Sequence, residues 1–177
     1  CAVLGFGALV PLYAEERYHI ATLDAGTLLT ARALGMIGVA AVAVFLLRRT
    51  GYRWPMAIGF SLAAIGLLIM ASSPHGLSPY AWLAVAAGLS GIGMGLCTPA
   101  SNNATLQLAP DQSAAIAGLR GMFRQSGAIT AVSVTAAVVA RSAHPGLAQA
   151  HVFEAFAAIL ILALPLIPLV PEHRGRW

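Results

Sequence analysis

Charge is what this sequence has least of. Only 9% of its 177 residues are Asp, Glu, Lys or Arg, whereas about a quarter of a soluble domain is charged. Hydrophobic residues make up 59% of the chain, and the mean hydropathy is +0.81. Because this small number of charges cannot cover a water-exposed surface, the composition excludes an ordinary soluble domain and favours a membrane protein.

Lysine is absent and cysteine is scarce. All ten basic residues are Arg, and the formal net charge is +4. These arginines fall mainly between apolar runs, as topology signals do, so we expect no nucleic-acid partner. Cys1 and Cys97 give no disulfide framework, and the scattered His residues have no metal-binding spacing. No Ser, His and Asp set lies at a common depth, so we expect neither an enzyme nor a metal site.

Six apolar segments run along the chain. A helix needs about 20 residues to cross a bilayer, because it rises about 1.5 Å per residue. We predict an all-α, polytopic six-helix transmembrane bundle in one domain, residues 1–177, with helices over about 1–13, 22–47, 54–72, 79–100, 113–140 and 147–170. The first segment is short and begins without Met, so we interpret it as the tail of a longer helix and the chain as a fragment.

The links between these segments predict the orientation. The link after the second segment contains Arg48, Arg49 and Arg53, whereas the first link is acidic, with Glu15 and Glu16. Basic links stay in the cytoplasm, so we expect even-numbered links and the carboxy terminus there, in the inner (plasma) membrane. All Trp and Tyr residues, such as Tyr13, Tyr52 and Trp54, fall at or just beyond segment ends, which is typical of interfacial anchors in a lipid bilayer.

Three arginines fall within the apolar segments. Arg32 lies near mid-membrane, where insertion costs about 2.5 to 3.5 kcal/mol, so it should face protein or water. We interpret it as a cavity or gate cation; the alternative is a static partner of a carbonyl or carboxylate. Arg120 and Arg124 are four residues apart and share a helix face with Gly127, which should point inward. The alternative, a snorkelling interfacial pair, is the one we favour for Arg120, whereas both interpretations stay open for Arg124.

Small and polar residues mark other positions. Gly88, Gly91, Gly93 and Gly95 lack the Lys and Ser or Thr of a phosphate-binding loop, and we expect them to allow close helix packing. Asn102, Asn103 and Gln107 are interpreted as solvated loop residues. We expect further close packing at two small-residue pairs, Gly59 with Ala63 and Ala117 with Gly121.

Several short motifs carry a family resemblance. They are Val10-Pro11-Leu12-Tyr13, Leu28-Leu29-Thr30-Ala31-Arg32-Ala33-Leu34-Gly35, Arg49-Thr50-Gly51-Tyr52-Arg53, Gly91-x-Gly93-x-Gly95 and Arg124-Gln125-Ser126-Gly127-Ala128. In this order they resemble the carboxy-terminal half of major facilitator superfamily transporters, specifically the drug:proton antiporters of the EmrB/QacA type. Ala31 and Ala33 replace the family's Pro and Gly beside the intramembrane arginine, and Arg48 replaces the acid of the loop motif.

The resemblance implies a fold and a site. Each half of such a transporter is a six-helix bundle of two inverted three-helix repeats, whose first, second, fourth and fifth helices line the cavity and whose third and sixth face lipid. The residues implied in the transport cavity or in gating are Arg32, Gly35, Gly91, Gly93, Gly95, Arg124, Gln125 and Gly127. Those implied in the cytoplasmic loop motif are Arg49, Gly51 and Arg53.

Together these features predict a secondary active transporter. By resemblance it exports amphipathic drugs or toxic metabolites by alternating access, driven by a proton gradient and without a cofactor. Its expected partners are the lipid bilayer, a small-molecule substrate and a missing amino-terminal half. One alternative is a facilitator or proton-coupled importer of a small polar or anionic metabolite, which an arginine could bind directly. Another is a membrane subunit or remnant that transports nothing.

Overall fold

The fold was analysed in a computed structural model that describes residues 2–74, 76, 78–108 and 112–169. Within these ranges the chain is helical and contains no strand. The elements are α1 (Ala2–Tyr18), α2 (Thr22–Thr50), α3 (Arg53–Ala71), α4 (Pro79–Leu108), α5 (Ser113–Ala140), α6 (Pro145–Ala163) and a 3-10 helix, η2 (Leu164–Leu169). Five stretches are long and apolar enough to cross a membrane: Leu23–Phe45, Arg53–Ala71, Pro79–Leu106, Ser113–Ala140 and Pro145–Leu169. The predicted all-α membrane bundle is confirmed.

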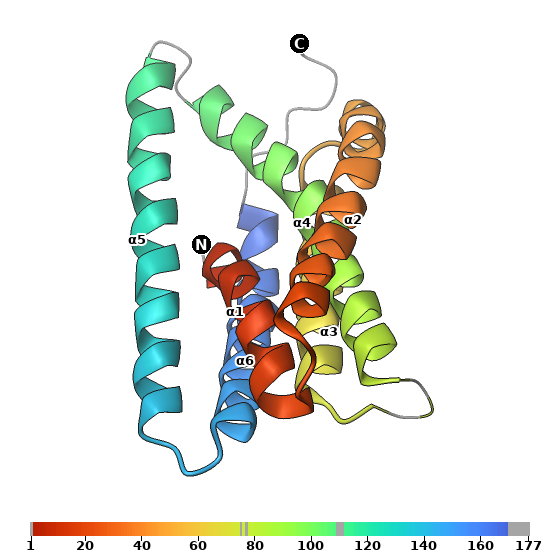
Figure 1. The fold of residues 1–177 in the computed structure, drawn as a ribbon. Helices are drawn as coiled ribbons and strands as arrows, with labels where there is room; N and C mark the ends of the chain where they lie inside the picture. Colours follow the sequence, from red (N-terminus) through yellow and green to blue (C-terminus); the bar gives the residue numbers. More distant parts are fainter. Residues whose placement is uncertain (1, 75, 77, 109–111, 170–177) are drawn as a thin grey trace.

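The helices run up and down, and the links alternate between the two ends of the bundle. Figure 1 shows that α2 and α4 end, and α3 and α5 begin, at one end of the bundle, whereas α1, α3 and α5 end, and α2, α4 and α6 begin, at the other. We call the first the basic end, because Arg49 and Arg53 lie there. The alternation follows from helices that each cross the bundle once.

Three helices end later than the sequence predicts. α2 continues to Thr50 rather than residue 47. α1 continues to Tyr18 rather than residue 13, so Glu15 and Glu16 lie in its last turns and not in a link. It stops at His19, whose φ is 53° and whose N–H donates to the Glu15 carbonyl at 3.0 Å. α4 continues to Leu108 rather than residue 100. Polar residues mark where the apolar segment ends, but a helix satisfies its own backbone bonds in water as well, so it continues.

Prolines set the ends of α6 and lie within α4. α6 begins at Pro145 rather than 147, and it ends at Ala163, one residue before Leu164 and Pro165 begin the 3-10 helix. Proline suits a first turn but cannot donate a hydrogen bond inside a helix. Pro99 lies within α4, whose last turns run toward α5 (Figure 1). A proline bend therefore carries the end of α4 over to α5.

Glycines hold α4 against two other helices. A Cβ atom on Gly91 would overlap the Arg32 carbonyl oxygen of α2, and one on Gly95 would lie 2.6 Å from the Met36 carbonyl oxygen. Gly93 points instead to α3, where its Cβ would lie 2.5 Å from the Gly59 carbonyl oxygen. The three glycines therefore serve two interfaces, because alternate residues of a helix face opposite sides.

The last carbonyls of α3 are bound by side chains from two other helices. Tyr13 of α1 donates to the Met70 carbonyl at 2.9 Å, and Arg17 donates to the Ala71 carbonyl at 3.0 Å. Trp82 of α4 donates its indole N–H to the Ile69 carbonyl at 2.8 Å. Such bonds satisfy carbonyls that a helix end leaves open, and the Arg17 charge complements the helix dipole. We call this set the α3 clamp.

The α3 clamp corrects the interpretation of the aromatic residues. Tyr13 and Tyr52 are fully or almost fully buried and are core residues, whereas Trp54 is exposed. The buried Gln149 of α6 adds a further tie, donating to the Leu9 carbonyl of α1 at 2.9 Å. The sequence places these groups near helix ends, but it does not show that neighbouring helices cover them.

Replacing Trp82 with Phe is expected to lower the free energy of unfolding by about 1 kcal/mol, the usual net contribution of one hydrogen bond. The effect should stay small because Ser72 also donates to the Ile69 carbonyl, at 2.7 Å. Thermal unfolding in detergent measures it. A midpoint equal to that of the parent protein would show that the indole hydrogen bond adds nothing.

Burial differs sharply among the helices. In α3 and α4, half of the apolar span is buried, whereas in α2 and α5 only 11% is buried. The resemblance implied that the third helix faces lipid and the second and fifth line a cavity. In this chain α3 is among the most enclosed helices, and α2 and α5 leave large side chains exposed, among them Leu34, Ile37, Met122 and Phe123. These faces need lipid or another protein surface to cover them.

Candidate functional site

Two cavities adjoin beside α4 and α5, and both are bordered by Arg120 and Arg124; one of them is also lined by residues of α2, α3 and α6. The first lies toward the basic end and has a volume of about 440 Å³. The second lies deeper in the bundle and has a volume of about 290 Å³. We call them the basic-end cavity and the central cavity.

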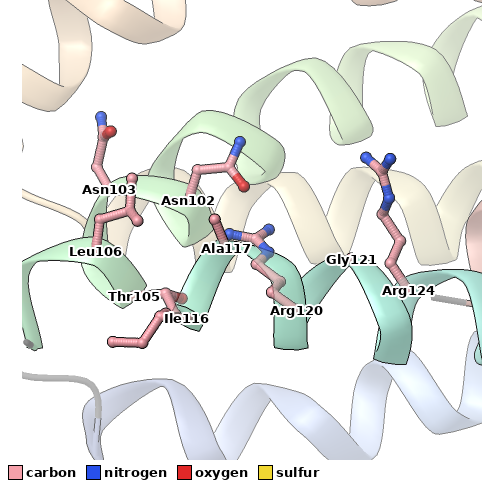
Figure 2. A pocket seen from close by; sticks show the side chains of 9 residues that line it. All are labelled: Asn102, Asn103, Thr105, Leu106, Ile116, Ala117, Arg120, Gly121 and Arg124. Carbon is pink, nitrogen blue, oxygen red and sulfur yellow. The ribbon is translucent and has the colours of Figure 1, made fainter. Parts of the chain in front are cut away.

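The basic-end cavity is polar on its α4 side. Figure 2 shows Arg120 and Arg124 extending from α5 toward α4, with Asn102 opposite Arg120. The lining residues are Asn102, Asn103, Thr105, Leu106, Ile116, Ala117, Arg120, Gly121 and Arg124. The proline bend in α4 brings these last turns over α5, so the site depends on Pro99.

The central cavity is mostly apolar. Met36, Phe60, Met94, Phe123 and Leu160 supply its hydrophobic wall. Its remaining lining residues are Ala63, Cys97, Thr98, Ser101, Arg120 and Arg124. An apolar chamber with hydroxyls and guanidinium groups at its edge suits an amphipathic small molecule.

Positive charge dominates both cavities. Among the described residues that line them there is no Asp or Glu. The two arginines are one helical turn apart, so their charges repel each other. Nη1 of Arg120 is buried and donates no hydrogen bond within the part of the chain that the structure describes. A negatively charged group of a ligand would offset both costs.

Arg32 lies outside both cavities. Its side chain is half-buried on α2, and its backbone packs against Gly91 of α4. Gly35, one turn further on, packs in the same interface, where an added Cβ would lie 2.6 Å from the Gly88 carbonyl oxygen. The structure therefore separates Arg32 and Gly35 from Arg124, although the resemblance grouped them in one cavity or gate.

The three glycines of α4 are buried packing residues, as described above. Gly91, Gly93 and Gly95 line neither cavity. The small-residue pair Gly59 and Ala63 also packs on α4, as predicted. The pair Ala117 and Gly121 does not, because both residues are exposed and border the basic-end cavity. A gating role of the glycines stays a prediction.

The arginine motif of α5 separates in space. Arg124 borders both cavities, whereas the neighbouring Gln125 is exposed and Gly127 is half-buried. Neither Gln125 nor Gly127 is among the lining residues of the two cavities. Successive helix residues point in different directions, so one cavity cannot receive the whole motif.

In the loop motif, Gly51 has a structural requirement of its own. Gly51 ends α2 with a φ of 77°, and its N–H donates to the Leu47 carbonyl at 3.2 Å. Glycine adopts this left-handed conformation without a steric cost. Arg49 is exposed, with its guanidinium 5.0 Å from the centre of the Phe45 ring, and Arg53 is half-buried in the first turn of α3.

The polarity pattern places part of the site in a loop. Asn102 and Asn103 lie instead in α4 and line the basic-end cavity. A signal was present, since Met94, Thr98, Ser101 and Thr105 recur at intervals of three or four residues, which places them along one face of a helix. Gln107 is in α4, but its side chain lies outside the described residues.

Comparisons with the curated proteins and with the solved structures found no significant match. A family model, that of the Major Facilitator Superfamily, matches residues 1–176. This match covers nearly the whole chain, and it agrees with the six helices, the five apolar spans and the alternating links. The chain belongs to the Major Facilitator Superfamily, a family of secondary transporters rather than enzymes.

Proposed function

We propose that this chain is the carboxy-terminal half of an exporter that couples the outward movement of amphipathic compounds to an inward proton flux. A second six-helix half covers the exposed faces of α2 and α5. The basic end and the carboxy terminus lie in the cytoplasm. The transporter is of the EmrB/QacA type, and its substrates are drugs or toxic metabolites.

The observation that carries the proposal is the lining of the central cavity. Met36, Phe60 and Phe123 provide apolar contact area, and Thr98 and Ser101 provide hydroxyl groups at the cavity edge. Such a wall binds molecules of varied shape, because apolar contact is not directional. The low burial of α2 and α5 supports a second half, since their exposed side chains are too many for a surface without a partner.

Proton coupling is tested with the complete transporter in inverted membrane vesicles. Drug accumulation should collapse when an ionophore removes the pH gradient, and drug addition should change the lumenal pH. Vesicles without the transporter serve as the control. Transport that continues unchanged without the gradient would contradict the coupling.

The place of the substrate is tested by Phe123→Ala. Loss of this ring from the central cavity should raise the drug KM about tenfold, since contact with a Phe side chain is worth about 1.5 to 3 kcal/mol. Phe45→Ala is the matched control, because Phe45 is exposed on α2 and borders neither cavity. Equal KM values for the two variants would place the substrate elsewhere.

The alternative in which Arg32 binds an anionic metabolite finds no support in these two cavities, because Arg32 lines neither of them. The cations that do border the cavities are Arg120 and Arg124. A role in anion recognition therefore passes to α5.

A further inference from the structure

We infer that the basic-end cavity is a binding site for a phosphate or carboxylate group carried on an apolar body. Arg120 and Arg124 bind the anion, and the amide of Asn102 donates to one of its remaining oxygens. The ligand is either the headgroup of an anionic lipid or a transported organic anion. The inference goes beyond the proposed function, and it rests on that function only for the second source.

The charges of the cavity carry the first step. Arg120 and Arg124 lie four residues apart on α5 and extend to the same side (Figure 2). Within the described lining, no carboxylate neutralises them. Like charges in this arrangement destabilise a helix, more so where water is scarce. A single anion between the two guanidinium groups turns the repulsion into two charge-assisted hydrogen bonds.

Hydrogen-bond donors without an acceptor also support an anion site. Nη1 of Arg120 is buried without a hydrogen-bond acceptor in the described structure. Asn102 lies opposite on α4 and carries an amide donor group, whereas the Thr105 hydroxyl already donates its hydrogen to the Ser101 carbonyl at 2.7 Å and adds no donor. Donors thus outnumber acceptors on this wall, which is the arrangement that selects an anion over a neutral or cationic group.

The position of the cavity carries the third step. Arg120 lies seven residues after the start of α5 at Ser113, or about 10 Å along the helix axis. A guanidinium group at this depth reaches the interfacial region where lipid phosphates lie. The central cavity adjoins through Arg120 and Arg124 and is apolar, so it can receive the hydrophobic body of the same ligand.

The test uses the complete transporter in detergent, without a pH gradient, and follows its thermal unfolding midpoint. The probes are phosphatidylglycerol, phosphatidylcholine of the same acyl chains, and 1-naphthyl phosphate. Phosphatidylglycerol or naphthyl phosphate should raise the midpoint in a saturable manner, and phosphatidylcholine should not. In Arg120→Gln and in Arg124→Gln the apparent affinity should fall about tenfold, and Arg120→Lys should retain most of it because the charge remains.

Arg49→Gln is the matched control, since it removes one cation from the basic end outside the cavity. If Arg120→Gln and Arg49→Gln weaken binding equally, or if phosphatidylcholine acts as well as phosphatidylglycerol, the site is disproved. Uptake into proteoliposomes separates the sources: accumulated naphthyl phosphate identifies a transported anion, and retained phosphatidylglycerol identifies a lipid site. Failure of proton coupling would leave these binding results unchanged, so the two proposals fail separately.

Discussion

Gly91→Ala should lower the thermal unfolding midpoint of the detergent-purified protein by roughly 2 to 12 °C. The added Cβ would overlap the Arg32 carbonyl oxygen, so α2 and α4 must move apart. Overpacking of this kind costs about 1 to 3 kcal/mol, and 1 kcal/mol corresponds to about 2 to 4 °C in a protein of this size. The displaced atoms are backbone, which cannot move aside as a flexible side chain would.

The matched control for Gly91→Ala is Gly38→Ala. Gly38 lies in α2, one of the two helices that meet at Gly91. A Cβ atom on Gly38 meets nothing within 4 Å. Alanine is favoured over glycine within a helix by about 1 kcal/mol, so this variant should equal or slightly exceed the parent in stability. Equal losses for the two variants would show that helix packing at Gly91 is not what the substitution disturbs.

Arg17→Gln should destabilise the protein by about 1.5 to 3 kcal/mol, the range for a hydrogen bond made by a charged group. Arg17 holds the Ala71 carbonyl at the end of α3 and also contacts the Tyr13 hydroxyl. Its guanidinium carbon lies 5.5 Å from the centres of both the Tyr13 and the Tyr18 rings, which adds a cation–π attraction. Removal therefore loosens α1 from α3 at one point of the α3 clamp.

A double-mutant cycle separates the Tyr13 and Arg17 contributions. Tyr13→Phe alone should cost about 1 kcal/mol through the lost bond to the Met70 carbonyl. The loss of unfolding free energy in the double variant should be smaller than the sum of the two single losses by at least about 0.5 kcal/mol, because each residue positions the other. Arg141→Gln is the control, since Arg141 is an exposed cation at the same end of the bundle. Strict additivity would refute the coupling.

The medium, the number of helices and their alternation could be predicted from the sequence. In lipid, a helix satisfies its own backbone hydrogen bonds. Long apolar runs that contain few charges and are joined by short links are therefore expected to form membrane-spanning helices. The pattern of α5 was clear enough that both its ends, Ser113 and Ala140, agree with the structure. Helix ends beyond the apolar runs, as in α1 and α4, could not be predicted, since polarity records the membrane boundary and not the last hydrogen-bonded turn.

Only the tertiary structure decided which residues meet. Arg32 and Arg124 are both intramembrane arginines in the sequence, yet Arg124 borders the cavities and Arg32 does not. Tyr13, at a helix end, proved to be buried beneath the end of α3, 57 residues further along the chain. Helical periodicity fixes the face on which a residue lies, but the partner of that face depends on close approach of backbones at Gly91 and Gly93 and on the bend at Pro99. These contacts depend on the distances between helices that are far apart in the chain, and a local sequence pattern does not encode those distances.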